Sequence, residues 1–324
     1  MEKTVASQQP THLSRDFKPN QGDEHRETQG TAGALIHAMT VDVEDYFHVA
    51  AFGHVIKTDE WDQWPCRVEA NTDKLLQLFD EVGIKATFFI LGWVAERYPQ
   101  VIRAITTRGH EIASHGYSHQ LIYKQTPAVF REETARSKAL LEDRTGQAIT
   151  GYRAASYSIT RQSLWALDIL SELGFTWDSS IFPVIHDNYG IPGSPRHPYQ
   201  IELPNGGSMT EFPLTTAKLL GYSLPAAGGG YFRQYPYPLS KWLFKRASEQ
   251  TSNPQIFYLH PWEVDPDQPR IPGAGWKSRF RHYTNLGRCY RRLEQLLRDF
   301  QFGTVRDSLG SVQITKKVNF SKAG

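Results

Sequence analysis

The sequence predicts an α/β fold built around a mostly parallel sheet. Short apolar segments alternate with segments of helical periodicity along most of the 324 residues, which is typical of β/α units. Polar and ionisable residues follow several of the apolar segments directly, as expected where the ends of parallel strands share one rim. We find neither an internal repeat nor a linker composition in the sequence, so we expect one domain.

The first ordered element is expected near Ala34. Residues 1–33 are rich in Gln, Thr, Asp, Glu and Gly and contain few apolar side chains, so they cannot bury enough surface to offset their ordering entropy. We therefore predict a disordered tail over residues 1–33. The mostly apolar run 34–41 is typical of a strand that is buried on both faces.

Alternating helices and strands are expected along the rest of the domain, which we place at residues 34–310 with a C-terminal extension from about residue 263. The first predicted helix begins at a cap formed by Asn71 or Thr72 and ends at Gly83. The other predicted helices are 93–107, 126–145, 160–173 and 286–300. The predicted strands are 85–91, 111–115, 149–153, 175–178 and 255–259. The Pro- and Gly-rich segment 183–207 predicts a long surface loop, and residues 311–324 a C-terminal tail.

Composition excludes several classes of protein. The net charge is +2, from 36 Lys and Arg against 34 Asp and Glu, so strong electrostatic capture of nucleic acid or of an anionic membrane is not expected from the whole chain. Cys66 and Cys289 are the two cysteines, too few for a disulfide scaffold or a cysteine zinc site. The sequence contains neither an apolar stretch long enough for a membrane-spanning helix nor an N-terminal secretory pattern, and we expect a cytoplasmic protein.

Two groups of residues suggest a metal site. Asp42, Glu44 and Asp45 follow the first predicted strand, and three carboxylates this close would repel one another unless they shared a cation or a proton. His115 and His119 are spaced i, i+4 at another strand end, so both imidazoles can face one cation. The alternatives are a solvated acidic turn and a chance pair of histidines.

Three further strand ends carry ionisable residues. Arg153 could orient a carboxylate by a bidentate contact, or could make a surface ion pair. His260, followed by Pro and Trp, would be partly desolvated and suited to donate a proton, although such a histidine can also be purely structural. Asp178 could orient that histidine or cap the next turn. After the glycines 228–230, which either let the backbone approach a sugar or form a structural turn, Tyr231 and Arg233 could line a groove.

The chain order of these residues resembles that of the polysaccharide deacetylases with a NodB homology domain, carbohydrate esterase family four. More narrowly it is similar to the deacetylases found at exosortase/PEP-CTERM exopolysaccharide loci. The resemblance runs from about residue 38 to about residue 305. The motifs that carry it are 40–48 (TVDVEDYFH), 115–119 (HGYSH), 177–183 (WDSSIFP), 228–233 (GGGYFR) and 257–262 (FYLHPW).

The resemblance implies a distorted (β/α) barrel of about seven strands, a single domain with a C-terminal extension. It also implies one divalent cation, usually Zn²⁺ with Co²⁺ or Ni²⁺ as alternatives, bound by an acidic residue together with His115 and His119. Carried over residue by residue, Asp42 matches the general base and Arg153 the residue that orients it. His260 matches the general acid, and Asp178 the residue that orients this acid.

The sequence departs from the family pattern at two places. The usual pair of adjacent aspartates is replaced by Asp-Val-Glu-Asp, so the acidic ligand is either Glu44, which a strand places on the same side as Asp42, or Asp45, if the chain turns sharply. Ala155 stands where many relatives have Pro, which leaves the oxyanion-binding amide unassigned. The substrate-binding candidates are Ser156, Tyr157, Tyr231, Arg233 and Trp262.

The expected activity is removal of N-acetyl groups from N-acetylhexosamine units of a bacterial exopolysaccharide or its precursor. The alternatives are an allantoinase-like or cyclic-imide amidohydrolase on the same fold, or a glycan-binding protein without catalysis. The expected partners are an N-acetylated glycan and the exopolysaccharide machinery at the inner membrane, and the protein would be either free in the cytoplasm or peripheral to that membrane.

Overall fold

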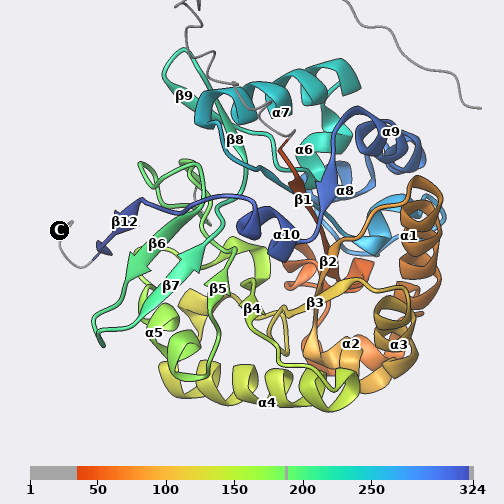
Figure 1. Ribbon diagram of the computed structural model, residues 1–324. Coiled ribbons are helices and arrows are strands. Elements are labelled where there is room, and N and C mark those ends of the chain that lie inside the picture. Colours follow the sequence, from red (N-terminus) through yellow and green to blue (C-terminus); the bar gives the residue numbers. More distant parts are fainter. Residues whose placement is uncertain (1–34, 187–188, 321–324) are drawn as a thin grey trace, which may run out of the picture. The chain divides into compact units, whose positions relative to one another are not determined.

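The fold is built on seven parallel strands, in a computed structural model that describes residues 35–186 and 189–320 (Figure 1). The expected tail at residues 1–33 lies outside the described residues. The strands lie in the order β10 (Ile256–Leu259), β1 (His37–Val43), β2 (Thr87–Ile90), β3 (Glu111–Ser114), β4 (Gly151–Tyr152), β5 (Trp177–Asp178) and β7 (Ser208–Glu211). The predicted α/β class and strand number are therefore confirmed.

The gap between β7 and β10 distorts the barrel. Among the described residues no strand ladder joins these two strands. Instead the Thr215 hydroxyl donates to the carbonyl of Ile256 (2.7 Å) and accepts from the amide of the same residue (2.9 Å). A side chain thus satisfies backbone groups that a strand partner would otherwise pair with.

Shorter strands extend the sheet beyond β7. They are β6 (Tyr199–Glu202), antiparallel to β7, and β12 (Lys317–Val318), parallel to β6, while β11 (Phe302–Gly303) pairs with β1 and β8 (Thr216–Leu219) forms a separate hairpin with β9 (Tyr222–Pro225). The prediction of a loop over 183–207 was wrong at β6, because pairing with β7 makes this part a strand despite the turn-rich composition of the segment. β12 lies within the expected tail 311–324.

Ten α-helices lie within the described residues (Figure 1). They are α1 (Val68–Val82), α2 (Gly92–Arg97), α3 (Pro99–Thr107), α4 (Pro127–Thr145), α5 (Trp165–Glu172), α6 (Gly229–Gln234), α7 (Tyr237–Thr251), α8 (Trp276–Tyr283), α9 (Leu286–Asp299) and α10 (Val305–Gly310). The single helix predicted over 93–107 is two, since Pro99 disfavours helical backbone at Tyr98, where φ is −127° and ψ is 59°. No described helix is long and apolar enough to cross a membrane.

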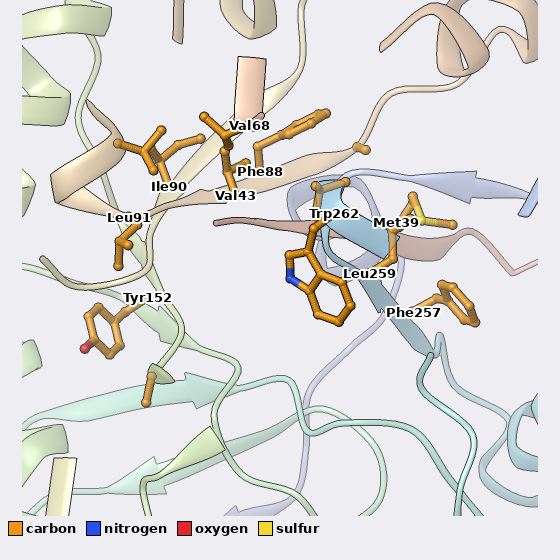
Figure 2. Close-up of a cluster of buried hydrophobic side chains, with 14 of the residues drawn as sticks. Met39, Val43, Val68, Phe88, Ile90, Leu91, Tyr152, Phe257, Leu259 and Trp262 are labelled. Atoms are coloured by element: carbon orange, nitrogen blue, oxygen red, sulfur yellow. The ribbon is translucent and has the colours of Figure 1, made fainter. Parts of the chain in front are cut away.

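Strand β1 has a different chemistry on each face, although all seven of its residues are buried. Met39 and Val43 belong to the main apolar core, where Figure 2 shows them together with Phe88 of β2 and Val68 of α1. Thr40 and Asp42 alternate with these residues and point the other way, into polar contacts inside the barrel. The alternation delivers a carboxylate to the interior at the end of the strand.

Two buried histidines outside the predicted site should make the fold sensitive to acid. His37 Nδ1 accepts a hydrogen bond from the Gln255 amide (3.0 Å), and His110 Nδ1 accepts one from the Ala86 amide (3.1 Å). Burial lowers the pKa of each to about 4, with Lys85 contributing at His110. Because an unfolded histidine has a pKa of about 6.5, the unfolded state binds more protons between about pH 6.5 and 4, and stability falls as the pH falls through this window.

We expect each of these histidines to lower the free energy of unfolding by about 1–2 kcal/mol between pH 7 and 5. Urea titrations at both pH values measure the total. His110→Asn keeps an acceptor near the Ala86 amide but does not titrate, so it should reduce the difference between the two pH values by one histidine's share. An unchanged pH difference in this variant would show that His110 is not responsible.

Candidate active site

The predicted site residues come from the carboxyl ends of several strands of the parallel sheet. Glu44 follows β1, His115 follows β3, Arg153 follows β4 and His260 follows β10. Because the strands are parallel, their carboxyl ends lie at one rim although they are far apart in the sequence. For example, the Thr40 hydroxyl on β1 donates to the Phe257 carbonyl on β10, 217 residues away. The arrangement depends on strand order and not on local sequence.

Asp42 is a fully buried carboxylate that a buried arginine holds in place. Arg153 Nη1 donates to Asp42 Oδ1 (2.6 Å) and to Thr40 Oγ1 (2.8 Å). The remaining guanidinium nitrogens bond to the carbonyl and hydroxyl of Ser179 at 3.1 and 2.9 Å, and the Phe89 ring lies 3.9 Å from the guanidinium carbon. The arginine therefore has one orientation available, and the carboxylate is paired with a fixed positive charge.

Glu44, His115 and His119 form a group that could hold a metal ion. One ligand atom from each lies within 4.8 Å of the others. His115 Nδ1 lies 2.9 Å from the Arg153 carbonyl, which can only accept, so Nδ1 carries the proton and Nε2 is left with a lone pair. Burial lowers the pKa of His115 to about 4, which keeps the imidazole in the neutral form that binds metals.

The contact between Glu44 and His119 also fits a cation. Glu44 Oε2 lies 2.7 Å from His119 Nε2, yet it has no hydrogen-bond partner among the described residues, and neither does His119 Nδ1. His119 has a φ of +51°, an uncommon conformation for a residue other than glycine. A carboxylate oxygen facing a ring nitrogen in this way, with a second imidazole beside them, is a donor set suited to Zn²⁺.

Asp45, the other predicted acidic ligand, has its carboxylate bound to backbone amides and not beside the histidines. Its carboxylate accepts hydrogen bonds from the amides of Tyr46 (2.8 Å), Val68 (2.8 Å) and Arg67. These bonds cap the short 3₁₀ helix 46–48 and tie it to the start of α1. The sharp turn required to bring Asp45 to the histidines is absent, so this part of the prediction is corrected in favour of Glu44.

His260 lies close to the carboxylates of both Asp42 and Glu44. Its Nε2 is 3.4 Å from Glu44 Oε1 and 3.9 Å from Asp42 Oδ2, and its Nδ1 is 3.1 Å from Glu263 Oε2. Its ring stacks on Trp262, with centroids 5.1 Å apart. Burial would lower the pKa of His260, but Glu44, Glu263 and Asp42 together outweigh burial and raise the pKa to about 9.

Asp178, expected to orient His260, contacts a different part of the protein. It is buried beside Glu211, and burial raises the pKa of both carboxyls. Ser180 Oγ donates to Asp178 Oδ1 (2.6 Å) and accepts from the Ala154 amide (2.8 Å). The pair therefore supports the backbone next to Arg153, and the residue that contacts His260 Nδ1 is Glu263.

The guanidinium of Arg233, a predicted substrate-binding residue, is buried and bonds to groups of the protein itself. Its side chain is 2% exposed and its Nε bonds to Glu263 Oε1 at 2.6 Å. Its Nη1 donates to the carbonyls of His282 (2.8 Å) and Thr284 (2.7 Å), which belong to the C-terminal extension. Arg233 thus fixes Glu263, and Glu263 in turn contacts His260.

An open cleft of about 870 Å³ leads to His260. Four predicted substrate-binding residues line it, Ser156, Tyr231, Arg233 and Trp262, whereas Tyr157 is buried with its hydroxyl 3.4 Å from Asp42 Oδ2. Ser156 and Tyr157 both have positive φ values, 51° and 55°. The cleft is of a size that small-molecule and sugar-sized ligands occupy.

Gly228 packs closely against strand β10. Its φ is +124°, and a Cβ there would lie 2.0 Å from the Tyr258 carbonyl oxygen. This glycine therefore permits close approach to β10, as the structural interpretation of the motif predicts, while Gly230 lines the cleft.

The sequence-based prediction of the site did not include Glu263 and Glu211, which contact His260 and Asp178. Glu263 follows His260 by three residues, a spacing that puts two side chains on one face of a helical turn, and this signal was available. Glu211 gave no comparable signal, because its partner Asp178 lies on β5 and the two meet only through pairing of β5 with β7.

Two family models match consecutive segments of the chain. Residues 60–177 match the family model described as polysaccharide deacetylase, and residues 179–310 match a domain of unknown function, DUF3473. The segment 60–177 is therefore similar to a polysaccharide deacetylase domain. The two metal-site histidines and Arg153 fall in the deacetylase match, whereas His260, Glu263 and Arg233 fall in the second match.

The curated relatives of the deacetylase domain include two from bacteria. A peptidoglycan deacetylase from Helicobacter pylori is 27% identical over 146 residues, which is 45% of each chain. A peptidoglycan-N-acetylglucosamine deacetylase from Bacillus cereus is 27% identical over 135 residues, 38% of this chain and 48% of the relative. The matches therefore span about half the length of these relatives.

Solved structures show the same fold. A putative polysaccharide deacetylase from Mycobacterium smegmatis has a TM-score of 0.58 at 20% identity, over 87% of this chain and 92% of that one. Puue allantoinase has a TM-score of 0.54 at 17% identity, over 91% and 97%. At these identities the likeness extends to the (β/α) barrel of the deacetylase domain and not to substrate.

Proposed function

We propose that the protein is a metal-dependent hydrolase that removes N-acetyl groups from N-acetylhexosamine units of a bacterial glycan. The observation that carries the proposal is the convergence of a candidate metal-binding group with the buried carboxylate of Asp42 and with His260, whose Nε2 lies 3.4 Å from Glu44 Oε1 and 3.9 Å from Asp42 Oδ2. Deacetylation of an amide needs a proton acceptor for water, an electrophile for the carbonyl and a proton donor for the amine. The candidate site offers a group for each of these needs.

Glu44, His115 and His119 would hold one divalent cation. Two nitrogens and one carboxylate are the donor set of many catalytic zinc sites, which leave a further position open; Co²⁺ and Ni²⁺ also suit these donors. When bound, the cation would polarise the amide carbonyl and acidify a water molecule. The burial of Glu44 and His115 limits competing hydration of the ligands.

Asp42 and His260 would divide the proton transfers. Asp42 accepts a proton from the water that attacks the acetyl carbon, and Arg153 keeps this carboxylate oriented. As the carbon–nitrogen bond breaks, His260 Nε2 donates a proton to the departing amine, so the products are acetate and a free amino sugar. Glu263 holds Nδ1 and directs Nε2 toward the site.

The finer substrate assignment rests on the motif resemblance. The segments 40–48 and 257–262 are similar to those of deacetylases at exosortase/PEP-CTERM loci. We therefore extend the proposal to an exopolysaccharide or its precursor as substrate, with the biosynthetic machinery of the inner membrane as partner and the cytoplasm as location.

The test is acetate release from N-acetylated chito-oligomers and from acetylated exopolysaccharide fragments. We expect release by the protein loaded with Zn²⁺, and at least about 100-fold less after chelation, restored by added metal. Opening of a hydantoin ring without acetate release would instead support the allantoinase-like alternative. Glycan binding without hydrolysis by the metal-loaded protein would support the binding-protein alternative, and full activity without metal would contradict the metal site.

A further inference from the structure

Helix α8 (Trp276–Tyr283) exposes two large aromatic side chains on one face. Trp276 is 74% exposed and Phe280 is 61% exposed, and their i, i+4 spacing places them one above the other. The opposite face is anchored, because the buried His282 stacks on Trp262 with ring centroids 4.2 Å apart and packs edge-on against Phe52 at 4.8 Å. The helix is thus held with its aromatic face toward solvent.

Positive charge surrounds these aromatic residues. Lys277, Arg279 and Arg281 are exposed on the same helix and form no ion pair with any described residue. Residues 268–293 contain seven Lys and Arg and no Asp or Glu, although the whole chain has a net charge of only +2. The charge is therefore concentrated in this part of the C-terminal extension.

The helix borders the mouth of the cleft. Ser278, Arg281 and His282 line the cleft together with His260, whereas Trp276 and Phe280 do not. The cationic residues Lys124 and Arg161 line the same cleft. A surface that contacted α8 would therefore lie directly at the entrance to the candidate active site.

We propose that α8 docks the mouth of this cleft onto an anionic phospholipid surface. Exposed Trp and Phe beside Lys and Arg are the composition of helices that lie in the membrane interface, where the rings enter the headgroup region and the cations attract acidic lipids. The seven Lys and Arg without Asp or Glu over residues 268–293 favour an anionic surface over a neutral glycan, which has no charge for them to attract. The docking surface goes beyond the proposed function and does not depend on catalysis.

The test compares binding of the full chain to vesicles of phosphatidylcholine with binding to vesicles that also contain phosphatidylglycerol. We expect at least about tenfold tighter binding to the acidic vesicles, weakened by high salt. Two double variants, Trp276→Ser with Phe280→Ser and Lys277→Gln with Arg279→Gln, should each lose about tenfold or more. Trp242→Ser, which removes a 43% exposed aromatic side chain on α7, is the matched control and should bind as the wild type does.

Equal binding to both vesicle types, or wild-type binding by the Trp276/Phe280 variant, would overturn the proposal. Binding of a soluble polyuronate that depends on Trp276, without binding to vesicles, would overturn it in favour of a glycan surface. Thermal melting establishes that each variant is folded. An Asp42→Asn protein should bind vesicles like the wild type, so a failure of docking is distinguishable from a failure of the proposed activity.

Discussion

Replacing Asp42 by Asn is expected to lower kcat for acetate release by about 10³-fold. Asparagine keeps an oxygen that can accept from Arg153 Nη1, now 2.6 Å from Asp42 Oδ1, but it cannot accept a proton from water. The buried Arg153 loses its ionic partner, so some loss of stability should accompany the loss of activity. Steady-state acetate release, with folding checked by thermal melting, measures both effects.

Asp45→Asn is the matched control for this experiment. Asp45 is as deeply buried as Asp42 and is three residues away, but its carboxylate caps a 3₁₀ helix and the start of α1. The variant should lose stability and retain kcat within a few-fold. If Asp45→Asn were as inactive as Asp42→Asn while still folded, Asp45 would belong to the reaction centre and the assignment of Glu44 would be wrong.

Glu263→Gln is expected to lower kcat by about 10- to 100-fold with little change in KM, the range seen when a residue that orients a functional group is removed. Glu263 is 3.1 Å from His260 Nδ1 and is held by Arg233 at 2.6 Å. A glutamine can present its amide nitrogen to Nδ1 in place of an acceptor, so the orientation and protonation of the ring are no longer fixed.

A double-mutant cycle separates positioning from structure. If Glu263 acts through His260, then adding Glu263→Gln to His260→Ala should cause little further loss of kcat. Asp178→Asn serves as the control, since this residue contacts Ser180 and Glu211, and not His260. Additive losses in the double variant, or a larger loss from Asp178→Asn than from Glu263→Gln, would contradict the role given to Glu263.

Much of the fold follows from local pattern. Short strands of two to seven residues alternate with helices, and this pattern is enough to indicate the α/β class. The two-residue period of a strand places Thr40 and Asp42 on one face of β1. His115 and His119 also converge, but through a non-helical segment with positive φ at Gly116 and His119, and not through the helical turn that the i, i+4 spacing predicted. Local pattern failed where composition and pairing conflict, as at β6, whose turn-rich surroundings concealed its pairing with β7.

Local periodicity therefore paired Asp42 with Glu44, because side-chain direction along one strand depends only on nearby backbone. That these carboxylates meet His115 and His119 was implied by the motif resemblance and is decided by the order of the strands. The tertiary structure alone decided that Glu44 and not Asp45 faces the histidines, since Asp45 is taken by amides of a distant segment. It likewise decided that Glu263 and not Asp178 contacts His260. The physical reason is that a buried carboxylate pairs with whichever donors strand order brings beside it, and strand order joins segments more than 200 residues apart.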